Sequence, residues 1–179
     1  MVVASKQIAR RFWVLWVSVT IAGWSVGSVV SDTAGDAVDE VWFDSLGLIV
    51  LGALIGGMQW LVLRYRVSWA GWWVVANIAG WSVGALVNVS WGLAAGWMVG
   101  LVVAGAFQWL IIWRRMPRAR WWVPANVVSW AMGIGVAFAV GATGAASGVV
   151  FGAVVGATTG IVLIWLFREP GPVGAQRRA

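Results

Sequence analysis

Six polar side chains recur at matched positions inside the apolar runs of this sequence, and their chemistry limits what the protein can do. They carry only amides and hydroxyls: Thr20, Asn77 and Asn126 in one set, and Gln59, Gln108 and Thr159 in the other. Such groups form hydrogen bonds, but they do not exchange protons near neutral pH as carboxylates or imidazoles do. They are therefore candidates for binding a ligand or lining a path, and not for acid–base catalysis.

The first polar set lies inside a repeated pattern of indoles and glycines. The clearest copy runs from Trp72 to Gly84 and holds Asn77 between Trp73 and Trp81. Two weaker copies keep its spacing: Trp16, Thr20, Trp24 and Gly27 upstream, and Trp122, Asn126, Trp130 and Gly133 downstream. These offsets fall on a single helix face, so Trp24, Trp81 and Trp130 join the candidate residues of the site.

A second pattern places glycines before the other polar set. Its members are Gly52, Gly56 and Gln59, then Gly105 and Gln108, then Gly152, Gly156 and Thr159. Small residues four apart let helix backbones approach closely in lipid, where no hydrophobic drive assists packing. We expect these glycines to form packing seams that the indoles of partner helices fill.

The composition is that of a membrane protein. Of the 179 residues 61% are hydrophobic and 10% are charged, and the mean hydropathy is +0.88. A soluble domain of this size does not tolerate such values. Cysteine and histidine are both absent, which removes a disulfide framework, a thiolate nucleophile and the commonest metal ligand. We therefore expect no metal site, and no cofactor is indicated.

Six apolar runs, at about 12–30, 46–63, 72–90, 94–113, 121–140 and 147–167, each approach the length that crosses a bilayer as a helix. The first run is too long for the apolar core of a signal peptide and carries a copy of the repeat, so we expect it to remain in the mature protein. The segment from Ser31 to Ser45 holds five of the six acidic residues. It is either a short amphipathic turn on the membrane surface or a solvated loop.

The basic residues predict the orientation. All twelve lie in the N-terminal segment, the second connection, the fourth connection or the tail. By the positive-inside rule both termini are cytoplasmic, and a bacterial inner membrane is the expected location. Because the basic clusters flank helix ends, they are topology determinants, and we expect no nucleic-acid partner.

The repeats predict an all-α polytopic membrane protein with a single domain over residues 1–179. Three helical hairpins, at about 12–64, 72–114 and 121–168, share one orientation and can be related by a pseudo-threefold axis along the membrane normal. Residues 169–179 read as a disordered tail. The paired signatures Gln59–Arg64 and Trp72–Asn77 resemble uncharacterised Trp- and Gly-rich bacterial membrane proteins built from tandem hairpins. That resemblance implies the hairpin architecture and no activity.

Two structural roles are open for the six polar residues. In the first, they form interhelical clamps inside each hairpin, pairing Asn77 with Gln108 and Thr20 with Gln59. In the second, they form a polar ring around the central axis that lines a ligand site or a narrow path. A side-chain amide left unpaired in hydrocarbon costs several kcal/mol, so each must find a partner in either case.

Two functions follow, and neither is enzymatic, since no nucleophile–base pair, carboxylate pair or phosphate loop is visible. No predicted span holds an ionisable residue in its interior, which argues against proton relays and ion-coupled transport. The first function is a structural or accessory subunit, or a binder of a hydrophobic ligand such as a lipid, quinone, carotenoid or pigment. Its partners would be the bilayer, that ligand, and a larger membrane assembly or a second copy. The alternative is a passive channel or facilitator for a small neutral solute through the polar ring.

Overall fold

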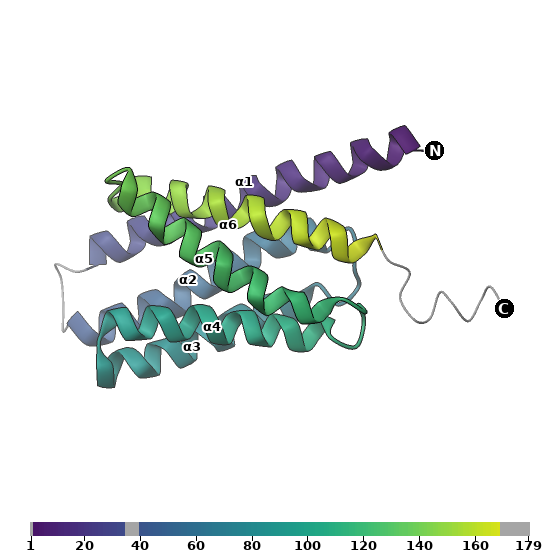
Figure 1. Ribbon diagram of the computed structural model, residues 1–179. Coiled ribbons are helices and arrows are strands. Elements are labelled where there is room, and N and C mark those ends of the chain that lie inside the picture. Colours follow the sequence, from purple (N-terminus) through teal and green to yellow (C-terminus); the bar gives the residue numbers. More distant parts are fainter. Residues whose placement is uncertain (1, 35–39, 169–179) are drawn as a thin grey trace.

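The computed structural model describes residues 2–34 and 40–168, and all of its regular structure is helical (Figure 1). Its elements are α1 (Val2–Ala34), α2 (Glu40–Leu63), α3 (Gly71–Trp91), α4 (Leu93–Ile112), a 3-10 turn η1 (Ala119–Trp121), α5 (Trp122–Ala139) and α6 (Gly144–Phe167). All six α-helices are long and apolar enough to cross a membrane. The prediction of a six-span, multi-pass membrane protein in contact with lipid is confirmed.

The helices extend beyond the apolar runs at several ends. α1 begins at Val2, ten residues before the predicted start, and continues to Ala34. Hydropathy marks the part of a helix that lies in hydrocarbon, whereas Lys, Gln, Arg and Ala continue a helix readily in the headgroup region. The acidic segment is consequently not one loop, because α1 and α2 cover its two ends. Residues 35–39 lie outside the described part of the chain. Residues 169–179, the predicted disordered tail, also lie outside it.

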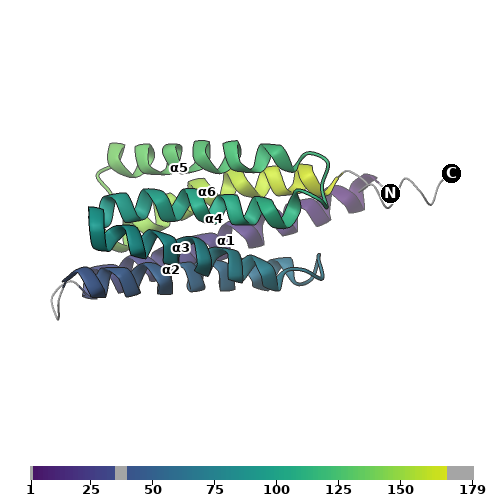
Figure 2. The ribbon, with the colours of Figure 1, turned by 90° about the horizontal axis from the view of Figure 1, so that it is seen from below.

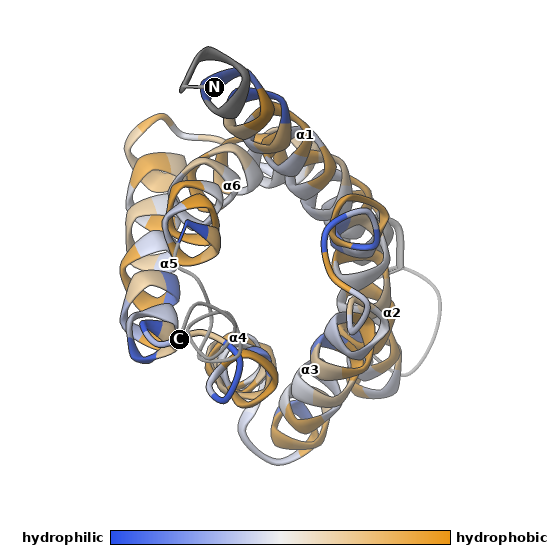
Figure 3. Ribbon diagram, turned by 90° about the vertical axis from the view of Figure 1, so that its right-hand side faces the viewer, coloured by the Kyte–Doolittle hydropathy of each residue, from blue (hydrophilic) through white to orange (hydrophobic). Residues whose placement is uncertain are grey.

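The six helices form a ring in chain order (Figure 3). Each packs against the helix before and the helix after it in the sequence, and α6 closes the ring on α1. Short connections impose this order; between α3 and α4 it is Gly92 alone, whose φ of 86° lies in the left-handed region that glycine adopts without strain. The threefold relation of the three hairpins stays a prediction.

The tightest seam joins α3 to α4 and is made of small residues, as the spacing of glycines predicts. A Cβ placed on Gly84 would lie 2.5 Å from the Gly96 carbonyl oxygen, and one on Gly80 would lie 2.4 Å from the backbone of Ala104. The two backbones therefore touch, which is the close approach that stabilises helix pairs in lipid. The α1–α6 seam has the same character at Gly152, where a Cβ would lie 2.8 Å from the Ile21 Cα.

α5 is the exception to this close packing. It has the least buried span, 22% against 44% for α3, and it crosses obliquely from the α6 side of the ring toward α4 (Figures 1 and 2). The sequence supplies a reason on both sides. When the repeats are aligned on Gln59, Gln108 and Thr159, Leu101 of α4 takes the position of Gly52 in α2 and Gly152 in α6. In the same alignment, Phe151 of α6 takes the position of Gly100 in α4. Large side chains at these places keep α5 from closing on its neighbours.

The two basic connections, after α2 and after α4, lie at the end of the ring where α1 begins and α6 ends, which we call the basic end (Figure 1). Arg66 donates to the Ile8 carbonyl at 3.4 Å, and the Arg115 guanidinium lies 5.6 Å from the Trp69 ring centroid. The connections after α2 and α4 thus contact each other and α1. Which side of the membrane the basic end faces stays a prediction.

Candidate functional site

The candidate residues meet around a small cavity on the axis of the ring, which we call the central cavity. Its volume is about 30 Å³, and all six helices contribute to its lining. Eight of the nine candidates line it: Gln59, Asn77, Gln108, Asn126, Thr159, Trp24, Trp81 and Trp130. A space of this size holds one or two water molecules. Eight of the predicted residues thus lie around one cavity, and its role as a ligand site or path stays a prediction.

Three matched hydrogen bonds surround this cavity. Trp73 Nε1 donates to Gln59 Oε1 at 2.8 Å, and Trp122 Nε1 donates to Gln108 Oε1 at 3.1 Å. Trp16 Nε1 donates to Thr159 Oγ1 at 3.0 Å, and that hydroxyl donates in turn to the Val155 carbonyl. Each bond links two neighbouring helices that belong to different predicted hairpins: α3 to α2, α5 to α4, and α1 to α6.

The predicted clamps inside each hairpin are therefore wrong. Neither Asn77 with Gln108 nor Thr20 with Gln59 forms a hydrogen bond in the described structure; the glutamines accept from indoles instead. Asn77 and Asn126 donate to carbonyls one turn back on their own helices, Trp73 and Trp122 respectively, each at 2.9 Å. Because a side-chain amide can bond its own helix, it needs no interhelical partner to avoid an unpaired donor.

Thr20 departs from the rest of the polar set. It is fully buried, it does not line the central cavity, and its Oγ1 has no hydrogen-bond partner among the described residues. A Cβ on Gly156 would lie 3.1 Å from the Thr20 Cβ. Thr20 is thus a small residue of the α1–α6 seam, where the threonine methyl and the neighbouring glycines pack together.

Aromatic layers close the axis on both sides of the central cavity. Toward the basic end lie Trp16, Trp73 and Trp122, each at most 1% exposed, with the Trp73 centroid 6.2 Å from that of Trp16 and 5.4 Å from that of Trp122. Toward the opposite end, Trp24 lies 5.9 Å from Trp81 and 4.4 Å from Phe151. The axis is filled by rings in this structure.

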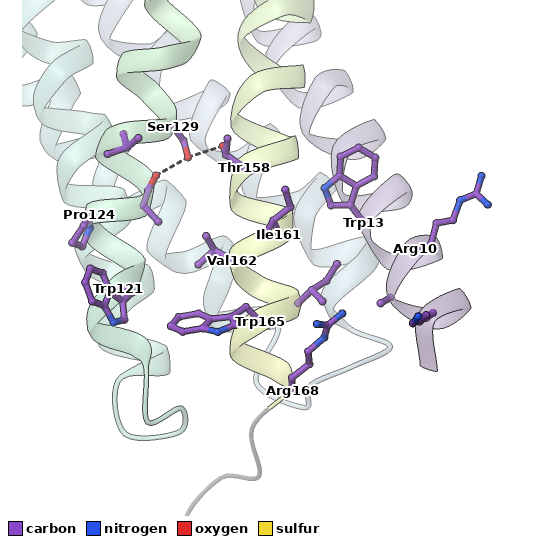
Figure 4. Close-up of a pocket in the computed structure, with 15 residues that line it drawn as sticks. Arg10, Trp13, Trp121, Pro124, Ser129, Thr158, Ile161, Val162, Trp165 and Arg168 are labelled. Carbon is purple, nitrogen blue, oxygen red and sulfur yellow. Dashed lines mark hydrogen bonds between the residues drawn. The ribbon is translucent and has the colours of Figure 1, made fainter. Parts of the chain in front are cut away.

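A large concave surface lies on the outside of the ring, near the basic end, and we call it the basic-end groove (Figure 4). It has a volume of about 1060 Å³ and lies over α6, with α1 and α5 as its sides. Its wall is mainly apolar, with Ile161, Val162 and Val128 among the residues. The oblique course of α5 explains its depth, because α5 and α6 separate toward the basic end.

Hydrogen bonds fix two parts of the basic-end groove. Trp13 Nε1 donates to the Ala157 carbonyl at 3.0 Å and ties the α1 side to α6. At the inner end, the Thr158 hydroxyl donates to the Ser129 hydroxyl at 2.6 Å and joins α6 to α5 (Figure 4). The Arg118 guanidinium lies 4.7 Å from the Trp165 ring centroid, in the range of a cation–π contact.

A third pocket, of about 310 Å³, lies toward the opposite end between α4, α5 and α6. Trp24, Trp97, Phe138 and Phe151 contribute rings to its lining, and Ser28 and Ser147 contribute hydroxyls. It occupies the other side of the oblique α5, where α4 and α5 separate. Both large pockets thus have one cause, the loose placement of this helix.

The basic-end groove was not predicted from the sequence, although the sequence holds a signal for it. Leu101 and Phe151 break the small-residue pattern next to α5, and such breaks indicate where helices separate. The predicted site consisted of polar and indole side chains on the axis and did not include these apolar positions.

Comparison of the chain with protein-family models, with curated proteins and with solved structures finds no match.

Proposed function

We propose that this protein is a non-enzymatic integral membrane protein that binds a hydrophobic ligand from the bilayer in the basic-end groove. The observation that carries the proposal is an apolar groove of about 1060 Å³ that opens at the lipid-facing surface. Ligand sites in proteins are concave, mostly apolar and about 300–1,000 Å³ in volume, with a few polar groups that fix orientation. The hydroxyl oxygens of Ser129 and Thr158 are such groups here.

The helix packing supports a site that accepts ligands from the side. α1 and α6 are joined along a glycine seam and form a fixed wall, whereas α5 is the least buried span. A ligand already dissolved in lipid reaches such a groove without crossing water, so its binding requires only that it displace bilayer lipid from the groove.

The alternative, a passive facilitator for a small neutral solute, draws support from the five polar residues around the central cavity. The same cavity measures about 30 Å³, and Trp16 and Trp122 on one side and Trp24 and Trp81 on the other fill the axis. A facilitator would need these rings to move apart, whereas the groove is open as it stands. This difference is why we favour the binder. Flux of a small neutral solute into liposomes, abolished by Asn77→Leu, would favour the facilitator.

Groove occupancy tests the proposal directly. Val128 lines the groove and is 57% exposed, while its neighbour Val127 is 46% exposed and does not line it. We expect Val128→Trp to fill the groove and to reduce the hydrophobic compounds that copurify in mild detergent at least about fivefold, as measured by mass analysis of the extract. Val127→Trp is the matched control and should retain them. Equal retention by both variants would overturn the proposal.

A further inference from the structure

Three cationic side chains line the basic-end groove at the end nearest the basic end of the ring, which we call its outer end. Lys6 and Arg10 come from α1, Arg168 follows the last residue of α6, and all three line the groove and are exposed. The Arg168 guanidinium lies between α6 and α1, while the Arg10 guanidinium extends outward from α1 (Figure 4). Because these long side chains are free at the surface, they can turn about their stems to meet an anion.

The charge at this end is of one sign. None of the described residues that line the groove is acidic, and no ion pair neutralises Lys6, Arg10 or Arg168 within the described part of the chain. The site therefore combines a long apolar wall with a cationic outer end. A neutral quinone or carotenoid would use the wall and leave the cations without a role, whereas an anionic amphiphile would use both.

The length of the groove corresponds to one leaflet. Thr158, at the inner end, and Arg168, at the outer end, are separated by ten residues of α6, about 15 Å of helix. This is about half of the roughly 30 Å hydrocarbon thickness of a bilayer. Trp121 and Trp165 lie near the outer end, at the level where indoles meet headgroups. A lipid of that leaflet would thus place its chains on the apolar wall and its headgroup among the cations.

We infer that the basic-end groove is a specific site for an anionic glycerophospholipid, with its phosphate held by Lys6, Arg10 and Arg168. The inference rests on the proposed function and names the ligand class. Each cation close to an anionic lipid surface contributes about a fivefold preference, less where salt screens it. Three of them predict at least about a tenfold preference for an anionic lipid over a zwitterionic lipid with the same acyl chains.

The test is native mass spectrometry of the purified full chain in the presence of equal amounts of phosphatidylglycerol and phosphatidylcholine with identical chains. We expect bound lipid in about a tenfold excess of phosphatidylglycerol. The variant Lys6→Gln/Arg10→Gln/Arg168→Gln should bring the ratio to about one. The control Arg64→Gln/Arg114→Gln/Arg120→Gln removes the same charge from the same end but outside the groove, and it should keep the preference.

The outcomes separate the two claims. Lipid bound without headgroup preference, or a preference lost equally in both triple variants, would overturn the inference and leave the proposed function standing. Failure of Val128→Trp to reduce bound lipid would overturn both, because the lipid would then lie elsewhere. A dimer mass without lipid, or binding that appears only after residues 169–179 are removed, would mean that a second copy or the chain's own tail covers the groove, and this would also overturn the inference.

Discussion

At the residue scale, buried indole N–H groups donate hydrogen bonds to the side-chain oxygens of buried glutamines. Trp73 is fully buried, and its Nε1–H finds the Gln59 carbonyl oxygen at 2.8 Å. An unpaired N–H in an apolar interior costs about 1–3 kcal/mol, so this contact determines how α2 and α3 are rotated relative to each other. The matched bonds of Trp122 and Trp16 have the same consequence for the α4–α5 and α6–α1 pairs.

A double-mutant cycle measures the Trp73–Gln59 contact. We expect Trp73→Phe and Gln59→Leu each to destabilise the protein, and the double variant to be more stable than the sum predicts by about 0.5–1.5 kcal/mol. The measurement is the free energy of unfolding in mixed SDS–detergent micelles. The control cycle pairs Gln59→Leu with Trp72→Phe, since Trp72 is 62% exposed, and it should be additive. Coupling of equal size in both cycles would contradict this account.

Eight of the nine candidate side chains line the central cavity, but the sequence did not show how they pair. Depth follows from position along a helix, so Gln59, Asn77, Gln108 and Asn126 could be brought to one level by counting residues. Pairing depends on the rotation of each helix, and that rotation is set by seams in which Gly52 faces Trp81 and Gly56 faces Asn77. Because α2 and α3 are in contact there, Gln59 lies within hydrogen-bond distance of Trp73 and does not pair with Thr20.

At the scale of the element, the distance between neighbouring helix backbones distinguishes tightly packed helix pairs from loosely packed ones. The α3–α4 seam has glycine or alanine at Gly80, Gly84, Gly96, Gly100 and Ala104. At the corresponding places α5 and α6 carry Ser129, Gly133, Ser147, Phe151 and Val155. The bulkier set keeps the backbones apart, and a Cβ on Gly133 would meet the Phe151 ring at 2.8 Å rather than a backbone atom. One helix pair is therefore tight and the other is open.

Gly84→Ala tests the tight seam. The added methyl would lie 2.5 Å from the Gly96 carbonyl oxygen and 2.9 Å from the Gly100 Cα, both backbone atoms that cannot rotate away. We expect a loss of about 1–3 kcal/mol in the free energy of unfolding. Gly135→Ala on α5 is the control, because nothing lies within 4 Å of its Cβ position; it should be neutral or stabilising by up to about 1 kcal/mol. A loss at Gly135 equal to that at Gly84 would remove the distinction between the seams.

At the scale of the whole molecule, hydropathy predicted the spans, because the six apolar runs correspond to six helices long enough to cross a membrane. The charge pattern predicts the orientation, which stays a prediction. The closed ring in chain order was not predicted and is a finding of the structure. The oblique course of α5 does not follow from hydropathy or charge. Its signal in the sequence is the break in the small-residue pattern at Leu101 and Phe151, and the basic-end groove depends on that course.

Cysteine labelling tests the predicted orientation of the whole molecule in the membrane, and the chain is suited to it because it contains no cysteine. Ser68 lies in the basic connection after α2 and Thr143 in the uncharged connection after α5, and both are exposed. Arginine-bearing loops stay on the cytoplasmic side, so we expect Ser68→Cys to react with a membrane-impermeant maleimide only in inside-out vesicles. Thr143→Cys should react in intact spheroplasts. The reverse pattern would place the basic-end groove in the outer leaflet, and labelling of both sites from one side would contradict the six-span topology itself.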